Sequence, residues 1–306
     1  MSVTRHTFKL AASALDVVAR PAAGVTVLIY HRVGRHTPVE VDLPTELFER
    51  QIEHLCARHE VVSLDEALAR LTGRCEDTRT AAQGGSRTVS GHGSPGHGSP
   101  GDGSPGDGGA GRRVPGGEVA VTFDDGTADF ASDAMPVLER HKVPVTLFVA
   151  TSFVESQRMF PDQGRPLSWS ALADCTTTGL VTVGSHTHTH ALLDRAGAAA
   201  VRDELDRSID LIGEHLGAAP AHFAYPKAVD GSPEAAREVK ARFASAALAG
   251  TKPNPYGRTD PYRLMRSPVQ ISDGMEWFAR KASGGLRAED AMRRALNKVR
   301  YRTKSA

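Results

Sequence analysis

Short apolar runs alternate with amphipathic segments along most of this 306-residue chain. The apolar runs, many of them rich in β-branched side chains, predict strands at 25–31, 60–62, 119–123, 143–150, 181–183 and 243–248. A strand end followed by a turn is predicted at 222–226, and an extended segment at 262–271. Apolar side chains at helical spacing predict helices at 45–59, 64–71, 130–141, 167–173, 198–216, 235–241, 274–282 and 288–299. Ser63 and Glu66 form the capping-box pattern of a helix start. Alternating strands and helices predict an α/β fold around a parallel sheet, open or closed into a barrel.

Residues 74–117 interrupt this pattern. From Gly91 to Gly109 the chain repeats Gly-(His/Asp)-Gly-Ser-Pro with almost no apolar side chains. Such a segment cannot bury enough apolar surface to offset the entropy lost on ordering, so we predict a disordered Gly/Ser/Pro-rich insertion. The preceding residues 1–73 are too few to hold a core alone. We therefore interpret 1–73 as the first part of the same fold that continues at 118–306.

Composition narrows the possible partners. The formal net charge is +1, which gives no reason to expect a nucleic-acid partner. No apolar run approaches the length of a transmembrane helix, so none is predicted. Residues 1–20 lack a clear signal-peptide pattern because Asp16 interrupts a short apolar stretch. We expect a cytoplasmic protein or one peripheral to the membrane, and the sequence leaves its oligomeric state open.

Two clusters of chemically active side chains follow predicted strands. Asp124 and Asp125 lie at the end of one strand, directly before Gly126, and His186 and His190 follow another. Asp-Gly alone is ordinary turn chemistry. However, adjacent carboxylates repel each other unless a cation or hydrogen bonds offset the cost, and α/β folds build their sites at the carboxyl ends of strands. The second cluster therefore favours a shared site.

The residue types in these clusters are typical of a catalytic metal centre. Two histidines and one carboxylate leave an open position for water on Zn²⁺ or a similar ion. His186, His190 and one of the two aspartates supply that set, while His188 is expected to point elsewhere. The other aspartate can take a proton from water at neutral pH. These residues alone do not say which aspartate has which role.

The two motifs resemble those of a known family. Thr122-Phe-Asp-Asp-Gly126 together with His186-Thr-His-Thr-His190 resembles the polysaccharide deacetylases of the NodB-homology type, carbohydrate esterase family 4. Leu28-Ile-Tyr-His-Arg-Val33 and Phe223-Ala-Tyr-Pro226 are similar to the branch that contains exopolysaccharide and poly-N-acetylglucosamine deacetylases. The resemblance covers most of the chain. It implies a distorted (β/α) barrel, with 118–306 as the catalytic domain.

The resemblance also implies roles for individual residues. Asp124 corresponds to the catalytic base, and Asp125, His186 and His190 correspond to the metal ligands, with Zn²⁺ the expected ion. Thr187 matches a small hydroxyl residue that braces the histidine loop. The implied reaction is hydrolysis of an N-acetyl group, in some members an O-acetyl group, from a glycan by a metal-activated water. The expected partner is thus an N-acetylated glycan substrate.

The chain departs from the family pattern in its third motif. Many members carry Arg-x-Pro-Tyr, whereas this chain has Ala224-Tyr-Pro-Lys227 and lacks the arginine. We expect Tyr225 and Lys227 to support the substrate or the oxyanion. Lys227 can offer its backbone N–H, and its side chain can meet an anionic substrate.

A second departure leaves the general acid open. Many members end with Leu-x-His, whereas this chain has Leu264-Met-Arg266. A guanidinium stays protonated and cannot serve as a general acid near neutral pH. We expect Arg266 to pair with Asp124 in place of the missing arginine. The remaining candidates for the acid are three histidines, His31, His188 and His222.

Two other functions stay open from sequence. The same scaffold can carry a hydrolase of a different amide or imide. The missing arginine and histidine are compatible with a carbohydrate-binding module that has little catalytic activity. The intact base and ligand set favour the deacetylase.

Overall fold

The computed structural model describes residues 23–73 and 117–286. Parallel strands close into a barrel, because β1 pairs with β5 along one edge and with β11 along the other. In order around the barrel these strands are β1 (Gly24–Tyr30), β5 (Glu118–Phe123), β6 (Val145–Val149), β7 (Val181–Ser185), β8 (His222–Ala224), β9 (Ser245–Ala249) and β11 (Leu264–Pro268). The predicted α/β barrel is confirmed.

Shorter strands extend the barrel at its edges. β4 pairs in parallel with the start of β5, β10 pairs antiparallel with the start of β1, and β2 pairs with β3 in a separate ribbon. Their bounds are β2 (Arg32–Val33), β3 (Asp42–Leu43), β4 (Glu60–Val62) and β10 (Asn254–Pro255).

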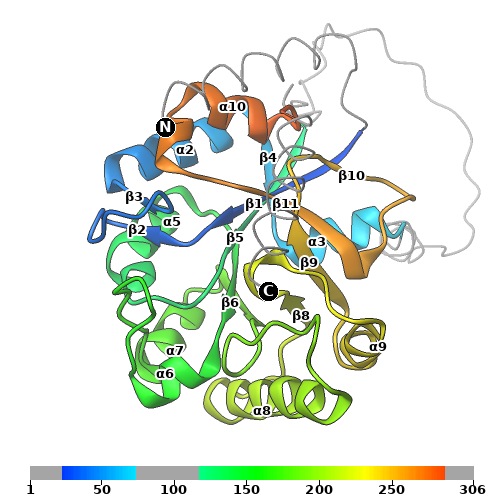
Figure 1. Ribbon diagram of the computed structural model, residues 1–306. Coiled ribbons are helices and arrows are strands. Elements are labelled where there is room, and N and C mark those ends of the chain that lie inside the picture. The colour runs from blue at the N-terminus through cyan, green and yellow to red at the C-terminus, as the bar shows by residue number, and fades with distance from the viewer. Residues whose placement is uncertain (1–22, 74–116, 287–306) are drawn as a thin grey trace, which may run out of the picture.

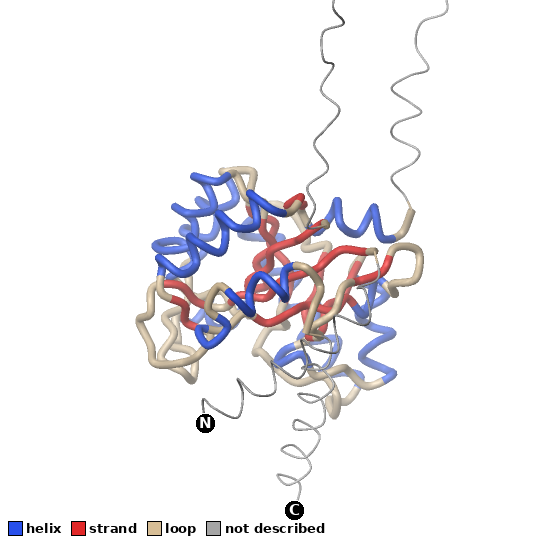
Figure 2. Tube along the Cα trace, turned by 90° about the horizontal axis from the view of Figure 1, so that it is seen from above, coloured by secondary structure: helices blue, strands red, loops and turns tan. Residues whose placement is uncertain are grey.

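Most helices lie around the outside of the strands (Figure 1), and the strands run between them when the molecule is seen from above (Figure 2). The α-helices are α2 (Thr45–Arg58), α3 (Leu64–Leu71), α5 (Met135–His141), α6 (Thr151–Ser156), α7 (Trp169–Thr177), α8 (Ala198–Leu216), α9 (Pro233–Arg242) and α10 (Glu276–Ala282). A π-helical turn, η1 (Phe130–Ala134), precedes α5, and 3₁₀ turns occupy η2 (Pro226–Ala228), η3 (Pro261–Arg263) and η4 (Ile271–Asp273).

The helix predicted at 130–141 is divided in two. A π-helical turn runs into α5, and Pro136 occupies the first turn of α5, where its missing N–H leaves no hydrogen bond unmade. The short helix α6 was not predicted, because six residues show too little periodicity to recognise. The segment predicted to be disordered and the helix predicted at 288–299 lie outside the described residues, apart from position 117.

Within residues 23–73 and 117–286, no helix is both long and apolar enough to cross a membrane.

The barrel interior is filled by small side chains around one large ring. Ala120, Ala224 and Ala247 face inward, and the Phe148 ring occupies the space that they leave. Gly184 is required on β7 because a Cβ there would lie 2.5 Å from the Phe148 ring. Helix α3 packs its apolar face against this interior cluster.

A capping box starts α3 as predicted, with the Ser63 hydroxyl accepting from the Glu66 N–H and the Glu66 carboxylate accepting from the Ser63 N–H. Asp65, the second residue of α3, contacts His222, the first residue of β8. Its carboxylate accepts a hydrogen bond from His222 Nε2 at 3.0 Å, and His222 Nδ1 lies 2.8 Å from Ser245 Oγ. This contact ties α3 to the amino end of the barrel.

Candidate active site

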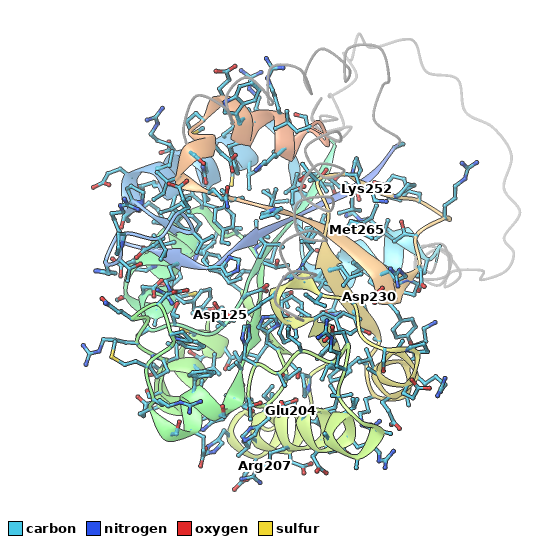
Figure 3. All side chains as sticks on the ribbon, in the orientation of Figure 1. Asp125, Glu204, Arg207, Asp230, Lys252 and Met265 are labelled. Atoms are coloured by element: carbon cyan, nitrogen blue, oxygen red, sulfur yellow. The ribbon has the colours of Figure 1, made fainter. Side chains whose placement is uncertain are left out.

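A cavity of about 500 Å³ opens at the carboxyl end of the barrel. Asp125, Asp230 and Met265 lie around it and come from three separate parts of the chain (Figure 3). Its charged and titratable lining side chains are His31, Arg32, Asp124, Asp125, Asp162, His186, His190, Lys227, Asp230 and Arg263. The two predicted clusters therefore meet in one cavity.

A tight turn at the end of β5 directs Asp124 and Asp125 in different directions. The Asp124 N–H donates to the carbonyl oxygen of Tyr30 at 3.0 Å, which continues the barrel pairing by one residue. Asp125 then adopts a left-handed φ of 76°, and Gly126 follows at 89°. Aspartate tolerates this region better than most residues because its short polar side chain bonds locally. The turn thus lets the neighbouring carboxylates of Asp124 and Asp125 contact different partners.

His186 is fixed at the end of β7. Its Nδ1 lies 2.8 Å from the carbonyl oxygen of Ala224, and a carbonyl can only accept, so the ring proton lies on Nδ1. The Nε2 lone pair is then free for a metal, and it lies 3.7 Å from Asp125 Oδ1. A carbonyl that orients a histidine in this way is a usual feature of metal ligands.

His190 reaches the same carboxylate from the following loop. Thr187 and His190 both have left-handed φ values, 64° and 63°, and the Thr187 hydroxyl accepts the Ala191 N–H at 3.1 Å. His190 Nε2 then lies 3.5 Å from Asp125 Oδ1. The buried Thr187 side chain therefore helps to hold the loop that carries both histidines.

These three side chains fit a divalent ion. One ligand atom from each of Asp125, His186 and His190 lies within 4.8 Å of the others. Burial, together with the neighbouring His186 ring, lowers the pKa of His190 to about 4, so its ring is neutral and able to bind a metal near pH 7. Two imidazoles and a carboxylate suit Zn²⁺ and similar ions.

Asp124 faces a different partner. Arg266 donates to both of its carboxylate oxygens, at 2.6 and 2.8 Å, and also to the Thr122 hydroxyl at 3.1 Å. The Arg266 side chain is fully buried, with its guanidinium 4.9 Å from the centre of the Phe148 ring. Burial by itself raises the pKa of Asp124, but the charges of Arg266 and His186 outweigh it and lower that pKa to about 2. Asp124 is therefore ionised near neutral pH.

The two residues of the third motif lie in different places. Lys227 lines the cavity with a left-handed φ of 53°. Tyr225 does not line it: its ring is 2% exposed and packs edge-on against Phe223 in the cluster between the barrel and helices α8 and α9. Tyr225 can therefore support the site only from behind the cavity wall, because alternate residues of a strand face opposite sides.

The three histidines that are candidates for the general acid lie in different places relative to the cavity. His31 follows β1, lines the cavity, and its charge contributes to the low pKa of Asp124. His188 Nδ1 lies 2.9 Å from the Thr151 hydroxyl, and the ring does not line the cavity. His222 begins β8 at the opposite end of the barrel. Arg32, which sequence analysis did not single out, also lines the cavity; its only signal was its place directly after His31.

Comparison with known proteins gives one matching family model and several structures of the same fold. Residues 111–243 match the polysaccharide deacetylase family. No curated protein matches the sequence. Among solved structures, IcaB from Ammonifex degensii is 24% identical with a TM-score of 0.65, over 86% of this chain and 99% of that one. The Streptococcus pyogenes deacetylase PplD in complex with acetate is 15% identical with a TM-score of 0.59, over 85% and 99%.

A de-N-acetylase from Aggregatibacter actinomycetemcomitans is 17% identical with a TM-score of 0.57, over 84% of this chain and 99% of that one. These similarities show a common barrel fold. Together with the sequence match, they show that residues 111–243 are similar to the polysaccharide deacetylase family and that the chain shares the barrel fold of these deacetylases.

Proposed function

We propose that this protein is a metal-dependent hydrolase that removes N-acetyl groups from a glycan. The observation that carries the proposal is the juxtaposition, in one cavity, of a three-residue ligand set and an ionised carboxylate outside that set. Asp125, His186 and His190 would hold the ion, with Zn²⁺ the expected one. Bound there, the ion would supply Lewis acidity for a water and for the acetamide carbonyl.

Asp124 is the proposed general base. Its Oδ2 lies 4.0 Å from His186 Nε2, so its carboxylate borders the ligand set without belonging to it. Arg266 holds both carboxylate oxygens and fixes their direction, which makes it a positioning residue. A carboxylate that is ionised and oriented in advance can take the proton of the attacking water without reorganising.

His31 is the proposed proton donor to the leaving nitrogen. It lines the same cavity, and its Nδ1 is buried without a hydrogen-bond partner among the described residues. An imidazole is suited to this step because its ordinary pKa lies near neutrality. The proposed donor to the developing oxyanion is the backbone N–H of Lys227, a residue that lines the cavity.

Acetate release from N-acetylglucosamine oligomers by zinc-loaded protein tests the proposal. We expect release that stops on chelation, and that falls at least about a hundredfold in Asp124→Asn, since general-base catalysis contributes on this scale. Asp203→Asn, an exposed change on α8, is the matched control and should leave the rate unchanged. Hydrolysis of small cyclic imides in place of glycans would contradict the proposal, as would sugar binding without acetate release.

A further inference from the structure

Two cationic side chains on the cavity wall, Arg32 and Lys227, have no carboxylate partner within residues 23–73 and 117–286. The third cation of the lining, Arg263, forms an ion pair with Asp230. The buried Arg266 behind the cavity is likewise neutralised by Asp124. Arg32 and Lys227 are therefore the arginine and lysine side chains of the cavity whose charge the described residues leave unpaired.

Arg32 is held in place by neutral groups. Its side chain is 4% exposed, and one guanidinium nitrogen, Nη1, donates to the carbonyl oxygen of Asp162 at 2.7 Å. Gly164 packs against the same group, because a Cβ there would lie 2.4 Å from Arg32 Nη2. Neither contact offsets a full positive charge, and burying an unpaired charge is costly.

Two donor atoms of the Arg32 guanidinium have no hydrogen-bond partner among the described residues. Nε and Nη2 make no hydrogen bond within the described part of the chain, and neither is a fully buried atom without a partner. Arg32 lines the cavity, while Gly164 packs against the Nε, Cζ and Nη2 atoms of its guanidinium. A guanidinium with two free donors in a fixed plane matches the two oxygens of a carboxylate or phosphate.

The carboxylates of the cavity do not cancel these two cations. Asp124 and Asp230 are each paired with an arginine, and Asp125 belongs to the proposed ligand set, where it would offset part of the charge of the ion. Asp162 is the remaining carboxylate, and its side chain is exposed. With a divalent ion bound, the cavity is positive, which favours a negatively charged ligand.

We propose that the natural substrate is an anionic N-acetylated glycan, in which a carboxylate or phosphate group lies close to the acetamido sugar and is bound by Arg32, with Lys227 adding a second positive charge. This inference rests on the proposed deacetylase function. It adds the substrate class, which the metal ligands and the base do not specify.

The test compares acetate release from three oligomers of matched length. They are tetra-N-acetylchitotetraose (chitotetraose below), a hyaluronan tetrasaccharide in which uronic acid alternates with N-acetylglucosamine, and a phosphate-bearing N-acetylglucosamine tetramer. We expect kcat/KM for at least one anionic oligomer to exceed that for chitotetraose by about tenfold or more, the value of one charge-assisted hydrogen bond. The advantage should shrink as ionic strength rises. The oligomer that shows it distinguishes carboxylate from phosphate.

Variants of Arg32 and Lys227 test whether these two side chains cause the preference for anionic oligomers. In Arg32→Gln and Lys227→Gln the ratio of anionic to neutral kcat/KM should fall towards one, and in Arg32→Lys it should be intermediate because the charge stays but the planar fork is lost. Lys227 is exposed, so its variant should fold even if the Arg32 variants do not. Arg165→Gln, a change at an exposed arginine that follows Gly164 in sequence and does not line the cavity, is the control and should leave both rates unchanged.

Equal kcat/KM for neutral and anionic oligomers in the unmodified enzyme, with a ratio that neither variant changes, would overturn the inference and leave the deacetylase function intact. Calorimetric binding of the same oligomers keeps the two questions separate. If no oligomer releases acetate, the proposed function fails. Tighter binding of an anionic oligomer, lost in Lys227→Gln, would still support the anion site, and equal binding would exclude it.

Discussion

Both ends of this barrel hold carboxylates and histidines in contact, but only one end is arranged as a reactive site. At the carboxyl end, Asp125, His186 and His190 surround a position that opens into the cavity. At the amino end, Asp65 and His222 are joined with Ser245 in the order of a hydrolase triad.

The two ends differ in whether the histidine nitrogens already have protein partners, and in whether the side chains can be reached from the cavity. Both ring nitrogens of His222 are used by protein groups, and His222 and Ser245 are 0% and 1% exposed, with neither lining the cavity. His186 donates from Nδ1 to a backbone carbonyl, and its Nε2 is left to bind a ligand. The same residue types are thus structural where every donor and acceptor is satisfied, and chemically available where one is not.

Removing a proposed metal ligand should produce the largest contrast between the two ends. Asp125→Asn is expected to lower acetate release at least about a thousandfold, because the ion contributes several kcal/mol of charge stabilisation. Metal stoichiometry, measured by elemental analysis, should fall with it. Asp65→Asn is the matched change at the amino end and should leave both quantities unchanged. Equal losses in the two variants would contradict the comparison.

Removing the partner of the base should act on both stability and pH dependence. Arg266→Met leaves the buried Asp124 unpaired, and breaking a buried ion pair costs about 3–5 kcal/mol of unfolding free energy. Without Arg266, burial raises the pKa of Asp124, so the acid limb of the activity profile should move to higher pH. Urea unfolding and a pH–rate profile measure the two effects. An unchanged acid limb would show that Asp124 is not the base.

The Asp124 pair should also be visible in acid unfolding. Its folded pKa of about 2 lies below the ordinary value of 3.8, so ionised Asp124 stabilises the fold at higher pH. This contribution, roughly 2 kcal/mol, is complete above the unfolded pKa and is lost as the pH falls from about 4 to about 2. Unfolding free energies across that range give the slope. Asp124→Asn should flatten it, whereas Asp203→Asn, the exposed control, should not.

The smallest effect is expected at the amino end. His222 lowers the pKa of Asp65 by a hydrogen bond, but the Asp65 side chain is 62% exposed and screened by solvent. Asp65→Asn should therefore cost below about 1 kcal/mol of unfolding free energy, and the cost should shrink in salt. A loss of several kcal/mol of unfolding free energy would show that the contact between Asp65 and His222 stabilises the fold more than an exposed ion pair does.

Much of the barrel was predictable because its strands are marked by local sequence. A parallel sheet covered on both faces needs continuous apolar runs, and those runs located β1, β5, β6 and β7. Pro136 also marked the division of segment 130–141, because proline favours the first turn of a helix. The short helix α6 was not predictable, since six residues show too little periodicity.

The sequence by itself determined which reactive side chains lie at the ends of strands, since Asp124 and Asp125 follow one apolar run and His186 follows another. Tertiary structure decided their partners. Arg266 lies 142 residues from Asp124 and meets it only because the strands close into a barrel and leave room in its interior for a buried guanidinium. It also separated His31 from His222, because one histidine follows its strand and the other begins one, so the barrel carries them to opposite ends.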